Sequence, residues 1–136
     1  MAGTFKFELV TPARMLIPER SADGKIEQSV EAEQAIVPGM DGQFTVLPGH
    51  APVITSLRPG VLEVKLTTGR RRVFVRGGIA EVSPDRLTIL AQHLVDLDNA
   101  DAEQLAAERK TAETMLAEAK DDADRLMAQS ALAALA

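Results

Sequence analysis

Hydrophobic and polar residues alternate in short runs along the first two thirds of the chain. Phe5, Phe7 and Leu9 alternate with charged neighbours, which is the two-residue period of a strand with one buried face. Similar extended runs recur in the ranges 14–17, 30–37, 62–66, 72–76, 79–82 and 87–91. Turn residues separate many of these runs at intervals of roughly 8–12 residues, a spacing typical of antiparallel sandwiches and barrels.

The range 37–60 interrupts this alternation. It holds four of the seven prolines and four of the nine glycines, interspersed with branched aliphatic residues. Proline fixes φ and lacks a backbone donor, whereas glycine reaches positive φ. We therefore expect short extended segments joined by sharp turns at the centre of a β domain. Further along, Gly77-Gly78 predicts a bulge or a close approach of another backbone.

The pattern changes after residue 97 to one typical of helices. Apolar residues recur at helical steps over 102–119 and again over 123–135, and Asp98 or Asn99 is expected to cap the first helix. The segment 120–122 is the expected break, because an aspartate there could cap a second helix. A single long helix and a folded-back hairpin are both compatible with this spacing.

Composition limits the classes of function. The 136 residues suffice for one domain with an appendage, and the chain contains no cysteine, which excludes disulfides and thiolate chemistry. Only 3% of the residues are aromatic, so a stacking platform for nucleic acid is not expected. No apolar run approaches the roughly 20 residues of a membrane span, and the start is unlike a secretory signal. These features predict a cytosolic protein, or one held at a membrane by partners.

The charge is divided unevenly along the chain. Residues 1–97 carry eleven basic and eleven acidic side chains, whereas residues 98–136 carry nine acidic and four basic ones. This asymmetry predicts two structural units, and the acidic second unit argues against a nucleic-acid partner.

Residues that could perform chemistry are scattered. His50 and His93 lack the sequence partners of a metal site, and no serine lies in a nucleophile motif. The cluster Arg70 to Arg72 is interpreted as a solvated or partner-facing hairpin edge. We predict no catalytic residue, no cofactor-binding residue and no metal ligand, which favours a binding or mechanical role.

Several motifs resemble a known family. The pattern V-P-G-x-x-G over 37–42, then L-P-G-H-A-P over 47–52, L-x-P-G over 57–60 and G-G-x-x-E-V over 77–82 resembles the epsilon subunit of bacterial F-type ATP synthase. The similarity covers essentially the whole chain. It implies a β-sandwich followed by two C-terminal helices.

The resemblance also implies a function. A member of this family is a noncatalytic subunit that joins the gamma subunit in the central stalk, stands on the c-ring and couples proton flow to ATP synthesis. The complex lies at the cytoplasmic face of the bacterial inner membrane, and the chain reaches the membrane only through it. The helices are the part that would reach the catalytic alpha and beta subunits. The residues that match the family's contacts with gamma and the c-ring are Thr11, Met40, Asp41, Gly42, Gln43 and His50.

The sequence departs from the family pattern at three places. Residues 20–28 resemble a small insertion, which we expect to be an exposed hairpin. Asp101 stands where ATP-sensing members carry an arginine, and a carboxylate there would repel a nucleotide phosphate. The second helix is acidic at its start, whereas inhibitory members have a basic one. These differences argue against ATP binding and against strong inhibition.

The resulting prediction is an α+β chain. An all-β sandwich of about ten short antiparallel strands is expected over residues 1–95, and an α-helical hairpin over residues 96–136. The leading hypothesis for function is a rotor subunit of ATP synthase. The alternative is a free-standing β-sandwich module that binds a protein or a carbohydrate through the range 37–60, and a small enzyme is the weakest interpretation.

Overall fold

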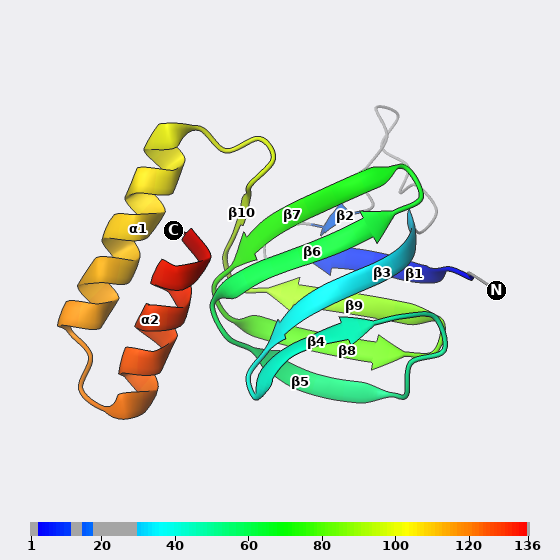
Figure 1. The fold of residues 1–136 in the computed structure, drawn as a ribbon, viewed down its shortest axis with the longest axis horizontal. Coiled ribbons are helices and arrows are strands. Elements are labelled where there is room, and N and C mark those ends of the chain that lie inside the picture. Colours follow the sequence, from blue (N-terminus) through cyan, green and yellow to red (C-terminus); the bar gives the residue numbers. More distant parts are fainter. Residues whose placement is uncertain (1–2, 12–14, 18–29, 136) are drawn as a thin grey trace.

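The computed structural model describes residues 3–11, 15–17 and 30–135. The described part contains ten strands and two helices (Figure 1). The strands are β1 (Phe5–Val10), β2 (Met15–Ile17), β3 (Val30–Gly39), β4 (Gly42–Val46), β5 (Val53–Leu57), β6 (Gly60–Leu66), β7 (Gly69–Val75), β8 (Gly78–Ser83), β9 (Arg86–Ala91) and β10 (Leu94–Asp96). The helices are α1 (Ala102–Ala117) and α2 (Asp122–Leu135).

Strand β3 is the longest strand and connects the two layers of the sandwich. The hydrogen-bonded order is β10-β7-β6-β3-β5-β8-β9-β1-β2, with β4 paired to β3. A further pairing of β3 with β1 closes the sheet on itself. This closure leaves few exposed strand edges, which suits a protein that must not pair with foreign strands.

The core lies between the layers and follows the alternation in the sequence. Phe5, Phe7 and Leu9 of β1 all point inward, with exposed fractions of 2% or less. Val37 of β3 and Ile89 of β9 meet them in the same cluster. Burying each of these side chains contributes roughly 1.5–3 kcal/mol to folding, so this apolar core is the main source of stability.

Two features of the sheet differ from the sequence-based prediction. Strands β1 and β9 pair in parallel, with Phe7 opposite Leu87, whereas only antiparallel pairs were expected. Alternation identifies a strand but not the direction of its neighbour, and here closure of the sheet sets that direction. The short strand β10 was also missed, because three residues carry too little periodicity to be recognised.

The residues that cap the helices can also be compared with the sequence-based prediction. Asp101, rather than Asp98 or Asn99, caps α1: its side chain accepts a hydrogen bond from Gln104 N at 2.8 Å, and Gln104 Oε1 accepts one from Asp101 N. Asp98 instead accepts a bond from Arg72 N at 2.9 Å, so it fastens the linker to β7. The break at 120–122 is confirmed, since Asp121 accepts a hydrogen bond from Asp124 N at the start of α2.

The helices form a hairpin that rests against the β6 and β7 side of the sandwich (Figure 1). Phe74 on β7 is completely buried beneath it, in a cluster with Ala112, Ala131 and Leu135. Small residues at this contact let the helices approach closely. The hairpin alternative is therefore the one that the chain adopts, and the single long helix is wrong.

Two expectations lie outside the described residues. They are the first residue of the predicted strand, Arg14, and the predicted hairpin at residues 20–28.

Candidate functional site

The turn between β3 and β4 is the first part of the candidate site. Gly39 and Gly42 are the last paired residues of the two strands, so Met40 and Asp41 form a two-residue hairpin tip. Gly42 has φ of +139°, a conformation that other residues rarely adopt, which explains the second glycine of the motif. Met40 is 36% exposed and Asp41 and Gln43 are also exposed, so the tip presents both apolar and polar atoms.

The base of this turn is held by neighbouring strands. A Cβ on Gly39 would lie 2.9 Å from Gly42 O, and one on Gly60 would lie 2.8 Å from Pro38 Cβ. The backbone of Met40 donates a hydrogen bond to Ser56 O at 2.8 Å. The turn is thus anchored to β5 and to the start of β6, which makes this corner of the sandwich stiff.

The structure brings most of the predicted contact residues to this end of the sandwich. Thr11 directly follows Val10, the last residue of β1. Val10 pairs with Leu90 of β9, Leu90 pairs with Ile79 of β8, and Ile79 pairs with Ser56 of β5, the residue that anchors the turn. Thr11 therefore lies at the same end as the turn, across the intervening strands.

His50 is the exception among the predicted contact residues. It follows the far end of β4, about 13 Å along the strand from Gly42. There Gly49 N donates to Pro84 O, and the His50 ring lies 6.2 Å from the Phe44 ring. The His50 backbone therefore lies at the opposite end of β4 from the β3–β4 turn.

A band of aliphatic side chains, three exposed and one half-buried, crosses four strands next to the turn. We name it the apolar stripe, and it consists of Val10, Ile54, Ile79 and Leu90. Ile79 pairs directly with Leu90, and Leu90 with Val10, while Ile54 lies diagonal to Ile79. Ile54 is 75% exposed, Ile79 47% and Leu90 42%. A row of exposed aliphatic residues on one sheet face is typical of a contact with another protein.

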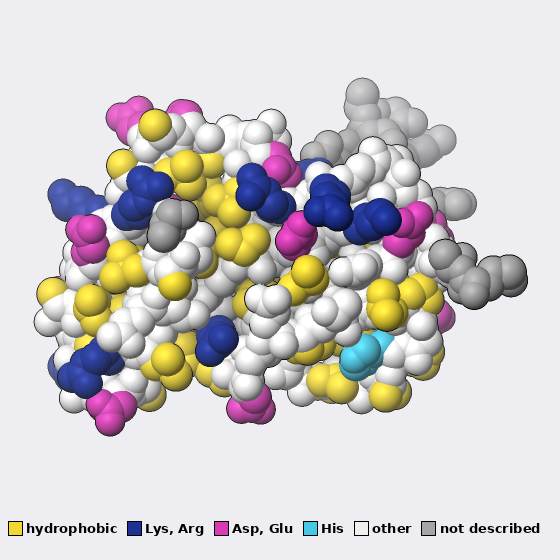
Figure 2. Space-filling view, viewed as in Figure 1, with side chains coloured by type: hydrophobic (Ala, Val, Ile, Leu, Met, Phe, Trp, Pro, Cys, Tyr) yellow, Lys and Arg dark blue, Asp and Glu magenta, His cyan; other side chains and the backbone are white. Residues whose placement is uncertain are grey.

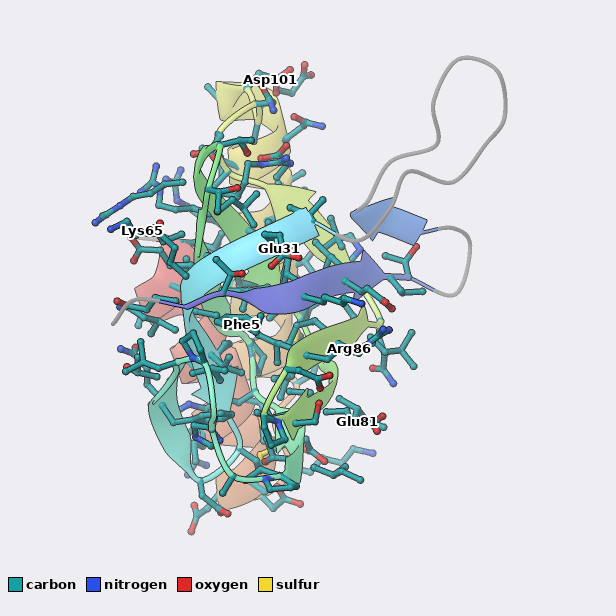
Figure 3. All side chains as sticks on the ribbon, turned by 90° about the vertical axis from the view of Figure 1, so that its right-hand side faces the viewer. Phe5, Glu31, Lys65, Glu81, Arg86 and Asp101 are labelled. Atoms are coloured by element: carbon teal, nitrogen blue, oxygen red, sulfur yellow. The ribbon has the colours of Figure 1, made fainter. Side chains whose placement is uncertain are left out.

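Charged residues border the apolar stripe further along the same strands. Arg86 forms an ion pair with Glu8 across the parallel β1–β9 ladder, and Glu81 is exposed beside them. Figure 3 shows Arg86 and Glu81 projecting from the same side of the sandwich, with Lys65 on the opposite side. An apolar centre with a polar rim is the usual anatomy of a protein interface.

Sequence reasoning missed the apolar stripe, although a signal was present. In β9 the consecutive apolar residues Ile89, Leu90 and Ala91 break the alternation of buried and solvated positions. A strand with apolar residues on both faces indicates that each face packs against other apolar residues. Ile89 packs into the core, so Leu90 marks the outer face as a surface that another protein could cover.

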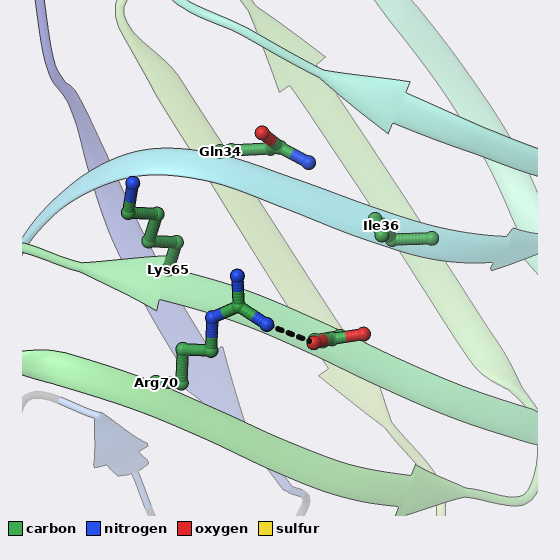
Figure 4. Close-up of a pocket in the computed structure, with 5 residues that line it drawn as sticks. Gln34, Ile36, Lys65 and Arg70 are labelled. Atoms are coloured by element: carbon green, nitrogen blue, oxygen red, sulfur yellow. Dashed lines mark hydrogen bonds and ion pairs between the residues drawn. The ribbon is translucent and has the colours of Figure 1, made fainter.

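The opposite face of the sandwich carries a groove of about 230 Å³ (Figure 4). It is lined by Gln34, Ile36, Glu63, Lys65 and Arg70. Its charges are paired: Arg70 Nη1 lies 3.2 Å from Glu63 Oε1, and Lys65 Nζ lies 3.3 Å from Glu33 Oε2. Figure 2 shows basic and acidic side chains interspersed along this face. Such pairing leaves little net charge for an anionic ligand.

Neither a metal centre nor a membrane span is found within the described ranges. No group of three or more acidic or histidine side chains there could hold a metal ion. Neither helix is long and apolar enough to cross a bilayer.

Comparison with known proteins gives consistent results. Residues 4–96 match the family model of the ATP synthase delta/epsilon chain beta-sandwich domain. The chain is 41% identical to the ATP synthase epsilon chain of Parvibaculum lavamentivorans over 133 residues, which is 97% of this chain and 90% of that protein. It is 39% identical to the epsilon chain of Rhodospirillum rubrum, covering 98% of this chain and 92% of the relative.

Two solved structures share the fold. A chain in the mitochondrial ATP synthase of Euglena gracilis, solved with OSCP, F1 and the c-ring, superimposes with a TM-score of 0.66 at 24% identity. That match covers 97% of this chain and 77% of the other. A chain from the central stalk and c-ring of the Tetrahymena thermophila enzyme gives a TM-score of 0.58 at 14% identity, covering 95% and 97%. At these identities the likeness concerns the fold alone.

Proposed function

The chain belongs to the delta/epsilon chain family of ATP synthases, and from this premise we propose that it is the epsilon chain of a bacterial enzyme. In this role it is a noncatalytic subunit of the central stalk that turns with the gamma subunit and the c-ring. It helps to couple proton flow to ATP synthesis. The similarity to named epsilon chains over nearly the full length of both proteins carries this proposal. A free-standing binding module has no comparable support.

The apolar stripe is the surface that we assign to the gamma subunit. A rotor partner stays bound through every turn, and permanent interfaces are more apolar than transient ones. Ile54, Ile79 and Leu90 are among the most exposed large hydrophobic residues in the described part of the chain. Covering them with gamma would remove aliphatic surface from water and hold the sandwich in place.

The β3–β4 turn is the surface that we assign to the c-ring. Met40, Asp41, Gly42 and Gln43 mix polar and apolar atoms, which suits contact with polar loops at a membrane surface. The anchoring of the turn through Ser56 O allows it to bear torque without deforming. We place Thr11 with this contact because it lies at the same end of the sandwich. We place His50 outside it, at the far end of β4.

Residues 96–136 are proposed as a separate unit without nucleotide binding. The Asp101 carboxylate is committed to capping α1, so it neither attracts a phosphate nor is free to move toward one. The acidic start of α2, with Asp121, Asp122 and Asp124, is poorly suited to acidic segments of the catalytic subunits. We therefore expect any contact with the alpha and beta subunits to inhibit hydrolysis weakly.

The proposed location is the cytoplasmic face of the bacterial inner membrane, with the chain attached through the complex. The test is complementation of a strain that lacks its own epsilon gene. We expect this chain to restore proton-coupled ATP synthesis in inverted membrane vesicles and to co-purify with gamma. Restored growth without gamma in the purified complex would refute the proposal, and so would failure of a well-expressed chain to restore coupling.

A paired variant tests the surface at the β3–β4 turn. Gln43→Arg together with His50→Ala changes one exposed and one half-buried side chain, neither of them in the core, so the domain should still fold. We expect proton pumping driven by ATP to fall in vesicles. The single variants separate the two positions: Gln43→Arg should account for the loss, and His50→Ala alone should pump normally. Unchanged pumping in the paired variant would remove the turn from the coupling surface.

A further inference from the structure

Glu81 is a charged residue that the fold leaves without a partner. It belongs to β8, and its side chain is exposed and points away from the sandwich (Figure 3). It forms no ion pair and no side-chain hydrogen bond within the part of the chain that the structure describes. The neighbouring glycines of the same sequence motif, Gly77 and Gly78, have positive φ, and Gly78 lies against the backbone of β9. The fold therefore accounts for the glycines of this motif but not for its glutamate.

Glu81 stands in the corner between two residues of the apolar stripe. It pairs directly with Ile54 of β5, so the two side chains lie side by side on the outer face. Ile79 lies two residues earlier on the same strand and points to that face as well. A partner that contacts both isoleucines must therefore also cover Glu81.

The cations of this face do not compensate Glu81. The four strands that carry the apolar stripe present two basic side chains here, Arg86 and Lys6. Arg86 already forms an ion pair with Glu8. Lys6 lies opposite Arg86 on β1, two strands away from β8. The residue that faces Glu81 on β9 is the uncharged Thr88, so the charge beside the stripe is left uncompensated.

A carboxylate that becomes covered needs a partner of opposite charge. Burial of aliphatic surface favours the covered state, but this attraction has no preferred direction. Covering a carboxylate without a counterion or a hydrogen-bond donor opposes binding. A cation on the partner turns this penalty into an attraction, and it also favours one docking orientation over the others.

We propose that the gamma subunit places an arginine or lysine side chain over Glu81, and that this ion pair sets the register of gamma on the apolar stripe. The inference rests on the proposed contact between the stripe and gamma, to which it adds a requirement for charge complementarity. The aliphatic side chains supply the area of contact, whereas Glu81 selects the orientation. Loss of the negative charge should weaken binding, and a positive charge in its place should weaken it further.

The experiment is calorimetric titration of the full chain with the gamma subunit of the same organism. Glu81→Gln keeps the size of the side chain and removes its charge, so we expect the dissociation constant to rise at least about tenfold. Glu81→Lys opposes the cation on gamma with a like charge, and the rise should be at least about a hundredfold. The matched controls are Glu113→Gln and Glu113→Lys, at an exposed residue of α1. They change the net charge by the same amounts and should bind like the parent chain.

A charge swap identifies the partner residue. Each arginine and lysine of gamma is changed in turn to glutamate, and one of these variants should bind Glu81→Lys more tightly than it binds the parent chain. Urea unfolding should give the same midpoint for the parent chain and for both variants of Glu81, because this side chain makes no contact of its own within the described fold.

The possible failures are distinguishable. Equal binding by Glu81→Gln and Glu113→Gln overturns the ion pair, and so does a loss in Glu81→Lys that no charge swap restores. If Ile79→Asp still weakens binding in either case, the proposed gamma contact stands without the ion pair. Absence of binding between the parent chain and gamma would overturn both the ion pair and the proposed contact.

Discussion

Replacing Gly78 by alanine should destabilise the sandwich more than any other conservative change at its glycines. Gly78 has φ of +137°, and a Cβ there would lie 2.1 Å from Leu90 O and 3.0 Å from Ala91 Cα. Both atoms belong to the backbone of β9, which cannot rotate away as a flexible side chain could. The new methyl group can be accommodated only if β8 and β9 separate.

The magnitude follows from two contributions. Holding a non-glycine residue at this φ costs about 1–3 kcal/mol. Forcing an extra carbon into a filled space costs about 1–3 kcal/mol more. The free energy of unfolding should therefore fall by about 2–6 kcal/mol, a large part of the about 5–15 kcal/mol available to a typical domain.

Gly69→Ala is the matched control. Gly69 has a similar φ of +142°, but no neighbouring atom lies within 4 Å of the position that a Cβ would take there. This variant isolates the backbone strain, so its free energy of unfolding should fall by only about 1–3 kcal/mol. Urea unfolding of both variants, followed by far-ultraviolet circular dichroism, measures the difference. Equal losses in the two variants would show that β9 does not approach Gly78 as closely as described.

Two further predictions concern the helices. Phe74→Ala removes the largest side chain beneath the hairpin. We expect the free energy of unfolding, measured with urea, to fall by about 3–5 kcal/mol. Limited proteolysis should then show early cleavage within residues 98–136. An unchanged cleavage pattern would show that Phe74 does not hold the hairpin. Asp101→Ala should lower the unfolding free energy by about 1 kcal/mol through loss of the cap, while Asp101→Asn should retain most of it. Equal losses in these two variants would contradict the capping role.

The sequence predicted those parts of the fold that local chemistry determines. The alternation of Phe5, Phe7 and Leu9 identified β1, and the rigid residues of the range 37–60 identified the sharp turns. Gly77-Gly78 was predicted to mark a bulge or a close backbone approach, and Gly78 indeed lies against β9. In each case a few neighbouring residues contain all the necessary information.

The missed features depend on residues that are distant in the sequence. The parallel pairing of β1 with β9 joins segments about eighty residues apart, and alternation within one strand cannot reveal it. The true cap of α1 is Asp101, because Asp98 is drawn to Arg72 on the sandwich. The apolar stripe also appears only when four strands are placed side by side. The position of His50 away from the β3–β4 turn likewise follows from the direction of β4.

The proposed gamma contact is tested most directly by calorimetric titration of this chain with the gamma subunit of the same organism. Ile79→Asp places a charge in the apolar stripe, and Leu126→Asp places one on α2 at a residue of similar exposure, 49% against 47%. We predict that Ile79→Asp weakens binding at least about tenfold, because burying an unpaired charge is strongly unfavourable. Leu126→Asp should bind like the parent chain. Unchanged binding by Ile79→Asp, or equal weakening by both variants, would contradict the account.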